Sequence, residues 1–151
     1  WTLRLLCVVL LVTPLRVHTG WAVLARWRRM LGLFVFFYAS LHLLAYAWLD
    51  MGFEWSELGP DIVKRPFITV GFLAWLLLLA LAATSFNRAI KALGARRWQR
   101  LHRAVYVVAG LGVLHFFWMR AAKNRWGEVA VYAAILGALL AWRVLHRWRR
   151  P

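Results

Sequence analysis

"MLGLFVFFYASLHLLAYAWLD" occupies residues 30–50 and carries no charged side chain before its last residue, Asp50. A helix of this length is about 30 Å long, which matches the hydrocarbon thickness of a bilayer. The segment lacks the apolar–polar alternation of a barrel strand, and backbone groups in lipid must be satisfied within the protein. It therefore predicts a membrane-spanning helix that contains one histidine, His42.

Four further apolar segments have the same character. They are residues 1–13, which we expect Pro14 to close, and residues 66–86, 102–119 and 129–145. The whole chain is 64% hydrophobic with 11 tryptophans, whereas a soluble domain is about 45–50% apolar. We expect residues 1–151 to form one all-α membrane domain of five transmembrane helices. Because residue 1 already lies inside an apolar run, we also expect one earlier helix, and six in the full-length chain.

The charges predict the orientation of this bundle. The net charge is +15, but a nucleic-acid-binding protein would not be so apolar, so we expect no nucleic-acid partner and contact with membrane lipid instead. Residues 14–29, 87–103 and 143–150 carry 4, 6 and 4 Lys or Arg, whereas residues 52–65 and 120–128 carry 2 and 3. Cytoplasmic segments are rich in Lys and Arg, so the first three segments are expected on the cytoplasmic side.

Three of the five histidines lie within or at the edge of predicted spans: His42, His102 and His115. Ionisable residues inside a membrane usually face a protein interior and mark functional sites, although a single one can also be a helix–helix hydrogen bond. His18 and His146 lie in the basic segments, where a solvated or headgroup-level position is expected.

His42 and His115 are predicted to share a depth in the membrane. His42 lies eight residues before Asp50, roughly 12 Å below that end, and His115 lies five residues before Arg120, roughly 8 Å below. Two neutral imidazoles on facing helices at one depth can ligate a haem iron. Zinc is a weaker interpretation, because no Cys, Asp or Glu is close enough in sequence to complete a tetrahedral site.

His102 indicates a second site near the cytoplasmic edge. Arg28 lies 14 residues before His42 and shares its helix face, but an arginine cannot ligate iron. Two alternatives stay open for this site: a haem held by His102 and an unusual second ligand, or an anionic cofactor such as a flavin phosphate held by arginines. Candidate phosphate-binding residues are Arg28, Arg29, Arg96 and Arg97, although Arg96 and Arg97 also suit anchoring beside anionic lipid.

His102 and His115 do not share a face of one ideal helix. They are 13 residues apart, which places them about 220° from a common direction. Gly110 and Gly112 lie between them and are the positions where we expect any adjustment of the helix.

Several stretches resemble the ferric reductase-like transmembrane domain, and more closely the MsrQ (YedZ) family. They are "LLVTPL" at 10–15, "RRMLGL" at 28–33, "SLHLLAYAWLD" at 40–50, "KRPFITVGFLAWLLLLALAATS" at 64–85 and "RRWQRLHRAVYV" at 96–107, followed by His115. The histidine-bearing stretches are the specific ones. This family normally has six helices, which agrees with an expected additional N-terminal helix.

The resemblance implies function as well as fold. Members of the family are membrane electron-transfer subunits with b-type haem, one or two per chain, and flavin mononucleotide as a further cofactor. The resemblance implies a bacterial inner-membrane location, with quinol or a cytoplasmic flavin reductase as electron donor. The implied acceptor is a periplasmic molybdenum-containing reductase of the MsrP type, which repairs methionine sulfoxide in proteins.

Two other functional classes compete with this interpretation. A related cytochrome b would end its reaction in quinol oxidation or in reduction of ferric or other metal ions. A non-redox transporter or scaffold would need midplane polar groups or broken helices in a repeat, and the sequence shows no repeat and no acidic residue well inside a span.

Overall fold

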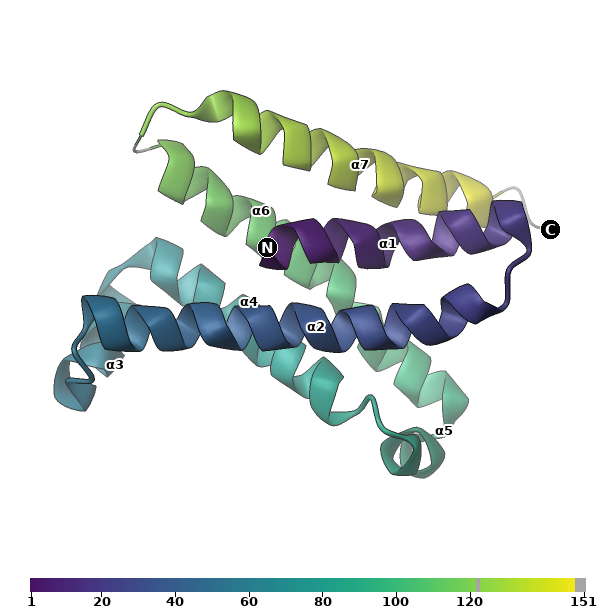
Figure 1. Cartoon of the computed structure of the whole chain (residues 1–151), viewed down its shortest axis with the longest axis horizontal. Helices are drawn as coiled ribbons and strands as arrows, with labels where there is room; N and C mark the ends of the chain where they lie inside the picture. The colour runs from purple at the N-terminus through teal and green to yellow at the C-terminus, as the bar shows by residue number, and fades with distance from the viewer. Residues whose placement is uncertain (122, 149–151) are drawn as a thin grey trace.

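The computed structural model describes residues 1–121 and 123–148, and this part of the chain is helical without strands. Its elements are α1 (Thr2–Thr19), α2 (Val23–Ala45) continuing into the π-helical turn η1 (Tyr46–Asp50), α3 (Trp55–Lys64), α4 (Pro66–Ala83), α5 (Asn87–His102), α6 (Ala104–Ala121) and α7 (Trp126–Trp148) (Figure 1). Five helical units are long and apolar enough to span a membrane: α1, α2 with η1, α4, α5–α6 and α7. The predicted all-α membrane fold with five spans is confirmed.

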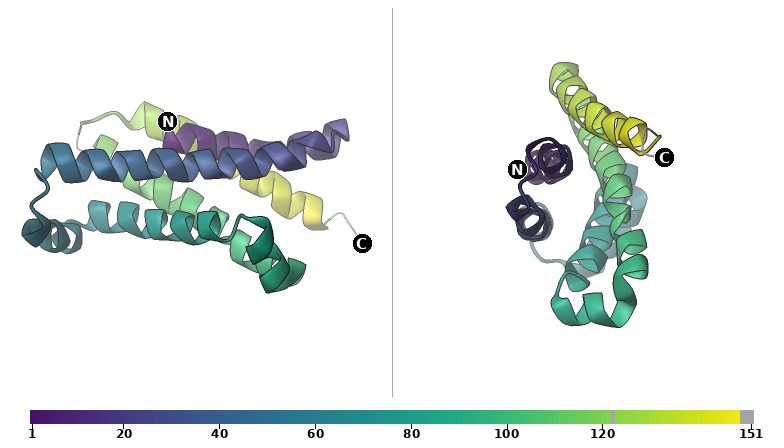
Figure 2. Two further views of the ribbon diagram at one scale, coloured as in Figure 1. Left: turned by 60° about the horizontal axis from the view of Figure 1, so that its bottom comes forward. Right: turned by 90° about the vertical axis from the view of Figure 1, so that its right-hand side faces the viewer.

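The spanning helices form a ring in the order α1, α2, α4, α6 and α7, with α7 returning to α1. Viewed from one end, α1 and α2 make one side of the bundle, and α4, α6 and α7 make the other (Figure 2). In the described part of the chain α2 and α6, which carry His42 and His115, do not pack closely on each other; α4 and α1 hold them apart. This spacing leaves room for a site between α2 and α6.

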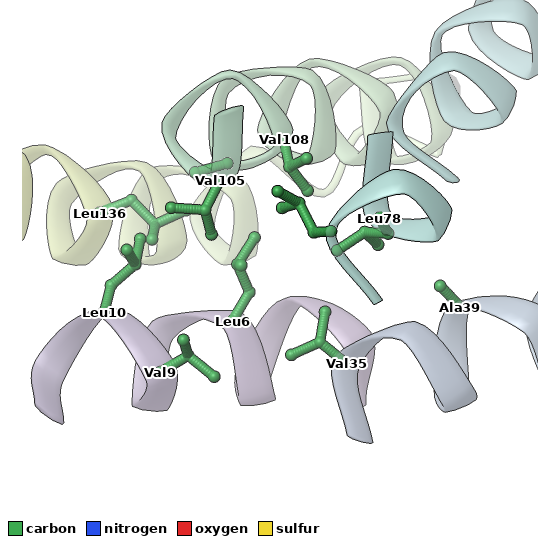
Figure 3. Close-up of a cluster of buried hydrophobic side chains, with 11 residues drawn as sticks. Leu6, Val9, Leu10, Val35, Ala39, Leu78, Val105, Val108 and Leu136 are labelled. Carbon is green, nitrogen blue, oxygen red and sulfur yellow. The ribbon is translucent and has the colours of Figure 1, made fainter. Parts of the chain in front are cut away.

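A small apolar core lies in the middle of the bundle (Figure 3). Each spanning helix contributes to it, and its largest fully buried side chains are Leu10 of α1 and Val35 of α2, at 0% and 1% exposure. Large apolar side chains also cover the outside of the helices, such as Phe37, Val107 and Val131, each more than half exposed. An apolar outer surface of this extent suits contact with lipid.

Pro14 does not close the first span, contrary to the sequence-based expectation. The helix α1 continues through Pro14 to Thr19 and ends at Gly20, whose positive φ of 73° is the left-handed conformation that glycine adopts easily. Proline has no N–H, so it leaves the carbonyl of Leu10 without its helical donor. The guanidinium of Arg143 on α7 donates to that carbonyl. A contact from a distant helix thus allows α1 to pass through Pro14.

The connections also differ from the prediction. Residues 52–65 and 87–103, expected as loops, contain the helices α3 and α5, and α2 begins at Val23 rather than at residue 30. The fourth span begins at Ala104, because a turn at Arg103 separates α5 from α6. This break, rather than Gly110 or Gly112, makes the change of direction between His102 and His115.

Candidate functional site

A cavity of about 1180 Å³ lies at the end of the bundle that holds α3, and we call it the α3-end cavity. Its walls come mainly from α1, α2, α4 and α6, and it contains both His42 and His115. The two imidazole rings are neighbours, with their centres 6.1 Å apart and their planes at 71° in an edge-on arrangement. The structure therefore brings together the two histidines that their predicted depths had paired.

The spacing of this pair suits a single metal ion between the rings. A metal–imidazole bond is about 2 Å long and the ring centre lies about 1 Å further, so two opposed imidazoles on one metal have centres about 6 Å apart. Among the described residues, no group of three or more His, Cys, Asp or Glu side chains gathers in a metal-binding arrangement. The residues present fit a metal whose other ligands come from a macrocycle, such as haem iron, better than a protein-only zinc site.

α4 fixes the orientation of His115. The Nδ1–H of His115 donates to the carbonyl oxygen of Phe67 at 2.7 Å, and a carbonyl can only accept, so Nε2 is left as the unprotonated nitrogen. A backbone carbonyl on the second ring nitrogen is the usual support for a metal-binding histidine. Gly71, one turn along α4, makes room for the ring, because a Cβ there would lie 2.9 Å from His115 Nδ1.

Aromatic side chains form a flat wall of the same cavity. Phe72 and Trp75 stack with ring centres 5.8 Å apart, and the indole N–H of Trp75 donates to Ser40 on α2 at 3.0 Å. The hydrogen bond satisfies the polar atom of Trp75 and ties α4 to α2. The two stacked rings give the cavity an aromatic lining, which suits a planar apolar ligand.

A second cavity of about 640 Å³ lies at the other end, and we call it the α5-end cavity. It is lined by His102 and Trp98 of α5 and by three arginines, Arg16, Arg28 and Arg29. Arg29 also donates to Asn87 at 2.9 Å. The structure therefore brings His102, Arg28 and Arg29 together, as the sequence had suggested.

Arg96 and Arg97 are not part of this group. Both are exposed on α5, and neither lines the α5-end cavity. The third arginine that lines the cavity, besides Arg28 and Arg29, is Arg16. Arg16 lies near the end of α1, whose continuation beyond Pro14 was not expected, so the sequence offered no signal for this contact.

His102 is held differently from His115. Its Nε2 lies 3.1 Å from the hydroxyl of Thr84, and that hydroxyl donates to the carbonyl of Ala80 at 2.8 Å. The hydroxyl therefore accepts from Nε2–H, which leaves Nδ1 as the unprotonated nitrogen. The ring also stacks on Trp98, with centres 3.9 Å apart. The two ends of the bundle thus present imidazoles in opposite tautomers.

The central core separates the two cavities. Leu6, Val35 and Leu78 line both of them and come from α1, α2 and α4. They belong to the buried apolar cluster, so a thin apolar layer is all that divides the cavities in the described part of the chain. Two sites stacked across the membrane and separated by apolar side chains suit transfer of electrons better than passage of ions.

An internal pair of histidines from two helices of a helical membrane bundle is the arrangement expected of ferric reductase-like proteins. The comparison with known families agrees, since the family described as ferric reductase like transmembrane component matches residues 1–113.

Similar proteins identify the family within this class. The chain is 64% identical to a protein of Polaromonas naphthalenivorans (strain CJ2), and the match covers 99% of this chain and 68% of that protein. It is 51% identical to a protein of Herminiimonas arsenicoxydans and 52% identical to one of Bordetella pertussis, over 99% of this chain and 69% and 72% of theirs. All three are described as heme-binding subunits MsrQ of a protein-methionine-sulfoxide reductase. No solved structure gives a significant match. The chain belongs to the MsrQ family of ferric reductase-like transmembrane proteins.

Proposed function

We propose that the chain is the haem-binding membrane subunit of a protein-methionine-sulfoxide reductase system and that it carries electrons across the bacterial inner membrane. The observation that carries this proposal is the neighbouring pair His42 and His115, 6.1 Å apart across a cavity between helices that do not pack on each other. A b-type haem bound there supplies one-electron oxidation and reduction of its iron.

The residues around the pair have separate tasks. His42 and the Nε2 of His115 would bind the haem iron, and the carbonyl of Phe67 keeps His115 in the required tautomer through the 2.7 Å hydrogen bond. Phe72 and Trp75 line the same cavity and would exclude water from a bound haem. A drier site would strengthen the effect of nearby charges on the iron.

The α5-end cavity receives electrons from the donor. His102, Arg28 and Arg29 surround it, and their character suits a second anionic cofactor, either a haem or flavin mononucleotide. The tautomer of His102 means that this cofactor is held differently from the first. Arg96 and Arg97 lie outside the cavity, where they suit contact with an anionic donor or with lipid headgroups.

The direction of transfer follows from the distribution of charge. The cation-rich segments lie at the α5 end, whereas all five acidic residues lie at the α3 end, in η1, in α3, between these two elements or at the start of α7. They are Asp50, Glu54, Glu57, Asp61 and Glu128. The α5 end therefore faces the cytoplasm. There the donor is quinol or a cytoplasmic flavin reductase, and at the α3 end the acceptor is a soluble periplasmic molybdenum-containing reductase of the MsrP type.

A visible spectrum with pyridine haemochrome quantitation tests the cofactor. The purified protein should show a low-spin Soret band, and His42→Ala and His115→Ala should each abolish the bis-imidazole signal. His18→Ala and His146→Ala are matched controls, because neither residue lines the α3-end or the α5-end cavity, and both should retain the signal. Full low-spin signal in both His42→Ala and His115→Ala would refute the assignment.

The α5-end site has its own test. His102→Ala should slow reduction by the physiological donor while the low-spin spectrum of the α3-end haem persists. Normal electron entry in that variant would show that His102 is only a helix-end histidine at the headgroup level.

A further inference from the structure

Arg4 occupies an unfavourable position in α1. It lies near the α3 end of a helix that spans the membrane, where the surrounding lipid disfavours a cation. Cations are also few at this end. Charged residues of membrane-spanning helices usually face the protein interior or a cavity. The side chain of Arg4 is exposed, and it lines the α3-end cavity.

α7 holds the side chain of Arg4 in place. Its Nε donates to the hydroxyl of Tyr132 at 3.0 Å, and its Cζ lies 5.2 Å from the ring centre of Trp1. Tyr132 is itself set against Phe116 of α6, with ring centres 5.7 Å apart. These contacts use Nε and one face of the guanidinium, and the partners are neutral. In the described part of the chain no hydrogen bond uses the terminal Nη groups of Arg4, so these groups can donate to an acceptor in the cavity.

The other arginines of the cavity are already paired with carboxylates. Arg65 lies 2.8 Å from Asp61, and Arg120 lies 3.0 Å from Glu128. Among the described residues, Arg4 makes no ion pair of this kind. Arg4 therefore differs from the other two arginines of the cavity. A neutral hydroxyl positions it, and its charge suits a carboxylate supplied by a ligand.

We propose that Arg4 binds a propionate carboxylate of the haem held by His42 and His115, and that Tyr132 is its positioning residue. The inference rests on the proposed function, because it requires a haem in the α3-end cavity. The propionates are the anionic groups of haem b, and a guanidinium can bind a carboxylate through two parallel hydrogen bonds.

Binding of haem and of its dimethyl ester tests the proposal directly. The ester keeps the iron and the macrocycle but has no carboxylate. Full-length protein produced without haem should bind haem at least about tenfold more tightly than the dimethyl ester, as followed by the low-spin Soret band. Arg4→Met should reduce this ratio to within about twofold and also lower the midpoint potential, because a cation near the haem is removed.

Two further variants isolate the contact. Tyr132→Phe should lower the ratio only in part and leave affinity for the ester unchanged, which a general packing defect would not do. Arg125→Met removes the same charge at the same end of the molecule from an exposed side chain that does not line the cavity, and it should keep the wild-type ratio.

The outcomes separate this inference from the proposed function. If His42→Ala and His115→Ala abolish binding of both compounds but Arg4→Met keeps the full ratio, the role of Arg4 is wrong and the haem site stands. If the wild-type protein binds the ester as tightly as haem, the proposal fails without any variant. If His42→Ala and His115→Ala bind both compounds normally, the proposed site itself fails.

Discussion

Replacement of Gly71 by Ala should weaken cofactor binding at the α3-end cavity. A Cβ at position 71 would lie 2.9 Å from both Cε1 and Nδ1 of His115, whereas ordinary contact begins at 3.4 Å, so the ring must retreat by about 0.5 Å or more. The same movement pulls Nδ1 away from Phe67, to which it is bonded at 2.7 Å. The substitution therefore disturbs both the position of His115, one of the two proposed iron ligands, and the hydrogen bond that supports it.

The expected cost follows from these two effects. Overpacking costs about 1–3 kcal/mol, and loss of the hydrogen bond costs about 1 kcal/mol. Partial relaxation of α4 and α6 should recover some of this, so we expect haem affinity to fall roughly 5- to 150-fold, equivalent to about 1–3 kcal/mol. The better helix propensity of alanine acts on folding of α4 rather than on binding.

Haem titration of the apoprotein, followed by the low-spin Soret band, measures this loss. Gly110→Ala is the matched control, because it makes the same change on α6 and its Cβ would meet nothing within 4 Å. It should bind haem as the wild type does. Wild-type affinity and spectrum in Gly71→Ala would refute the reasoning that close contact with α4 positions His115.

Two further predictions concern the bundle and its orientation. Arg143→Met should lower the free energy of unfolding in detergent by about 2 kcal/mol, because the Leu10 carbonyl freed by Pro14 loses its donor. In a Pro14→Ala background the loss should be about 1 kcal/mol smaller, since an alanine N–H can serve that carbonyl; equal losses in both backgrounds would contradict this role. In a cysteine-free chain, a cysteine at Glu57 should react with an impermeant reagent from the periplasmic side and one at Ala95 should not, and the reverse pattern would overturn the proposed direction of electron transfer.

The features that depend on distance along a helix could be predicted from the sequence. The rise of about 1.5 Å per residue and the thickness of the bilayer locate each span and place His42 and His115 at similar depths. Their rings are neighbours in the structure. Arg28 was likewise expected on the face of α2 that carries His42, and both residues line cavities inside the bundle.

Helix boundaries were less predictable where a distant residue determines them. Pro14 ends a helix by local rules, but Arg143 from α7 supplies the missing donor, and α1 continues to Thr19. α3 and α5 lie in connections whose polar composition resembles that of loops. Arg96 and Arg97 were grouped with the α5-end site by their charge alone, and the rotation of α5 leaves them exposed.

Composition, charge and histidine spacing by themselves determined that these residues form five helical membrane spans with an imidazole pair at one depth. The tertiary structure alone decided which atoms meet: Phe67 and Gly71 against His115, Thr84 against His102, and Arg4 with Tyr132 at the cavity wall. The physical reason is that spans which are apolar on every side carry little periodic signal for their rotation about the helix axis. Depth is a property of one helix in a bilayer, whereas the tautomer of a histidine and the partner of an arginine depend on contacts between helices far apart in the chain.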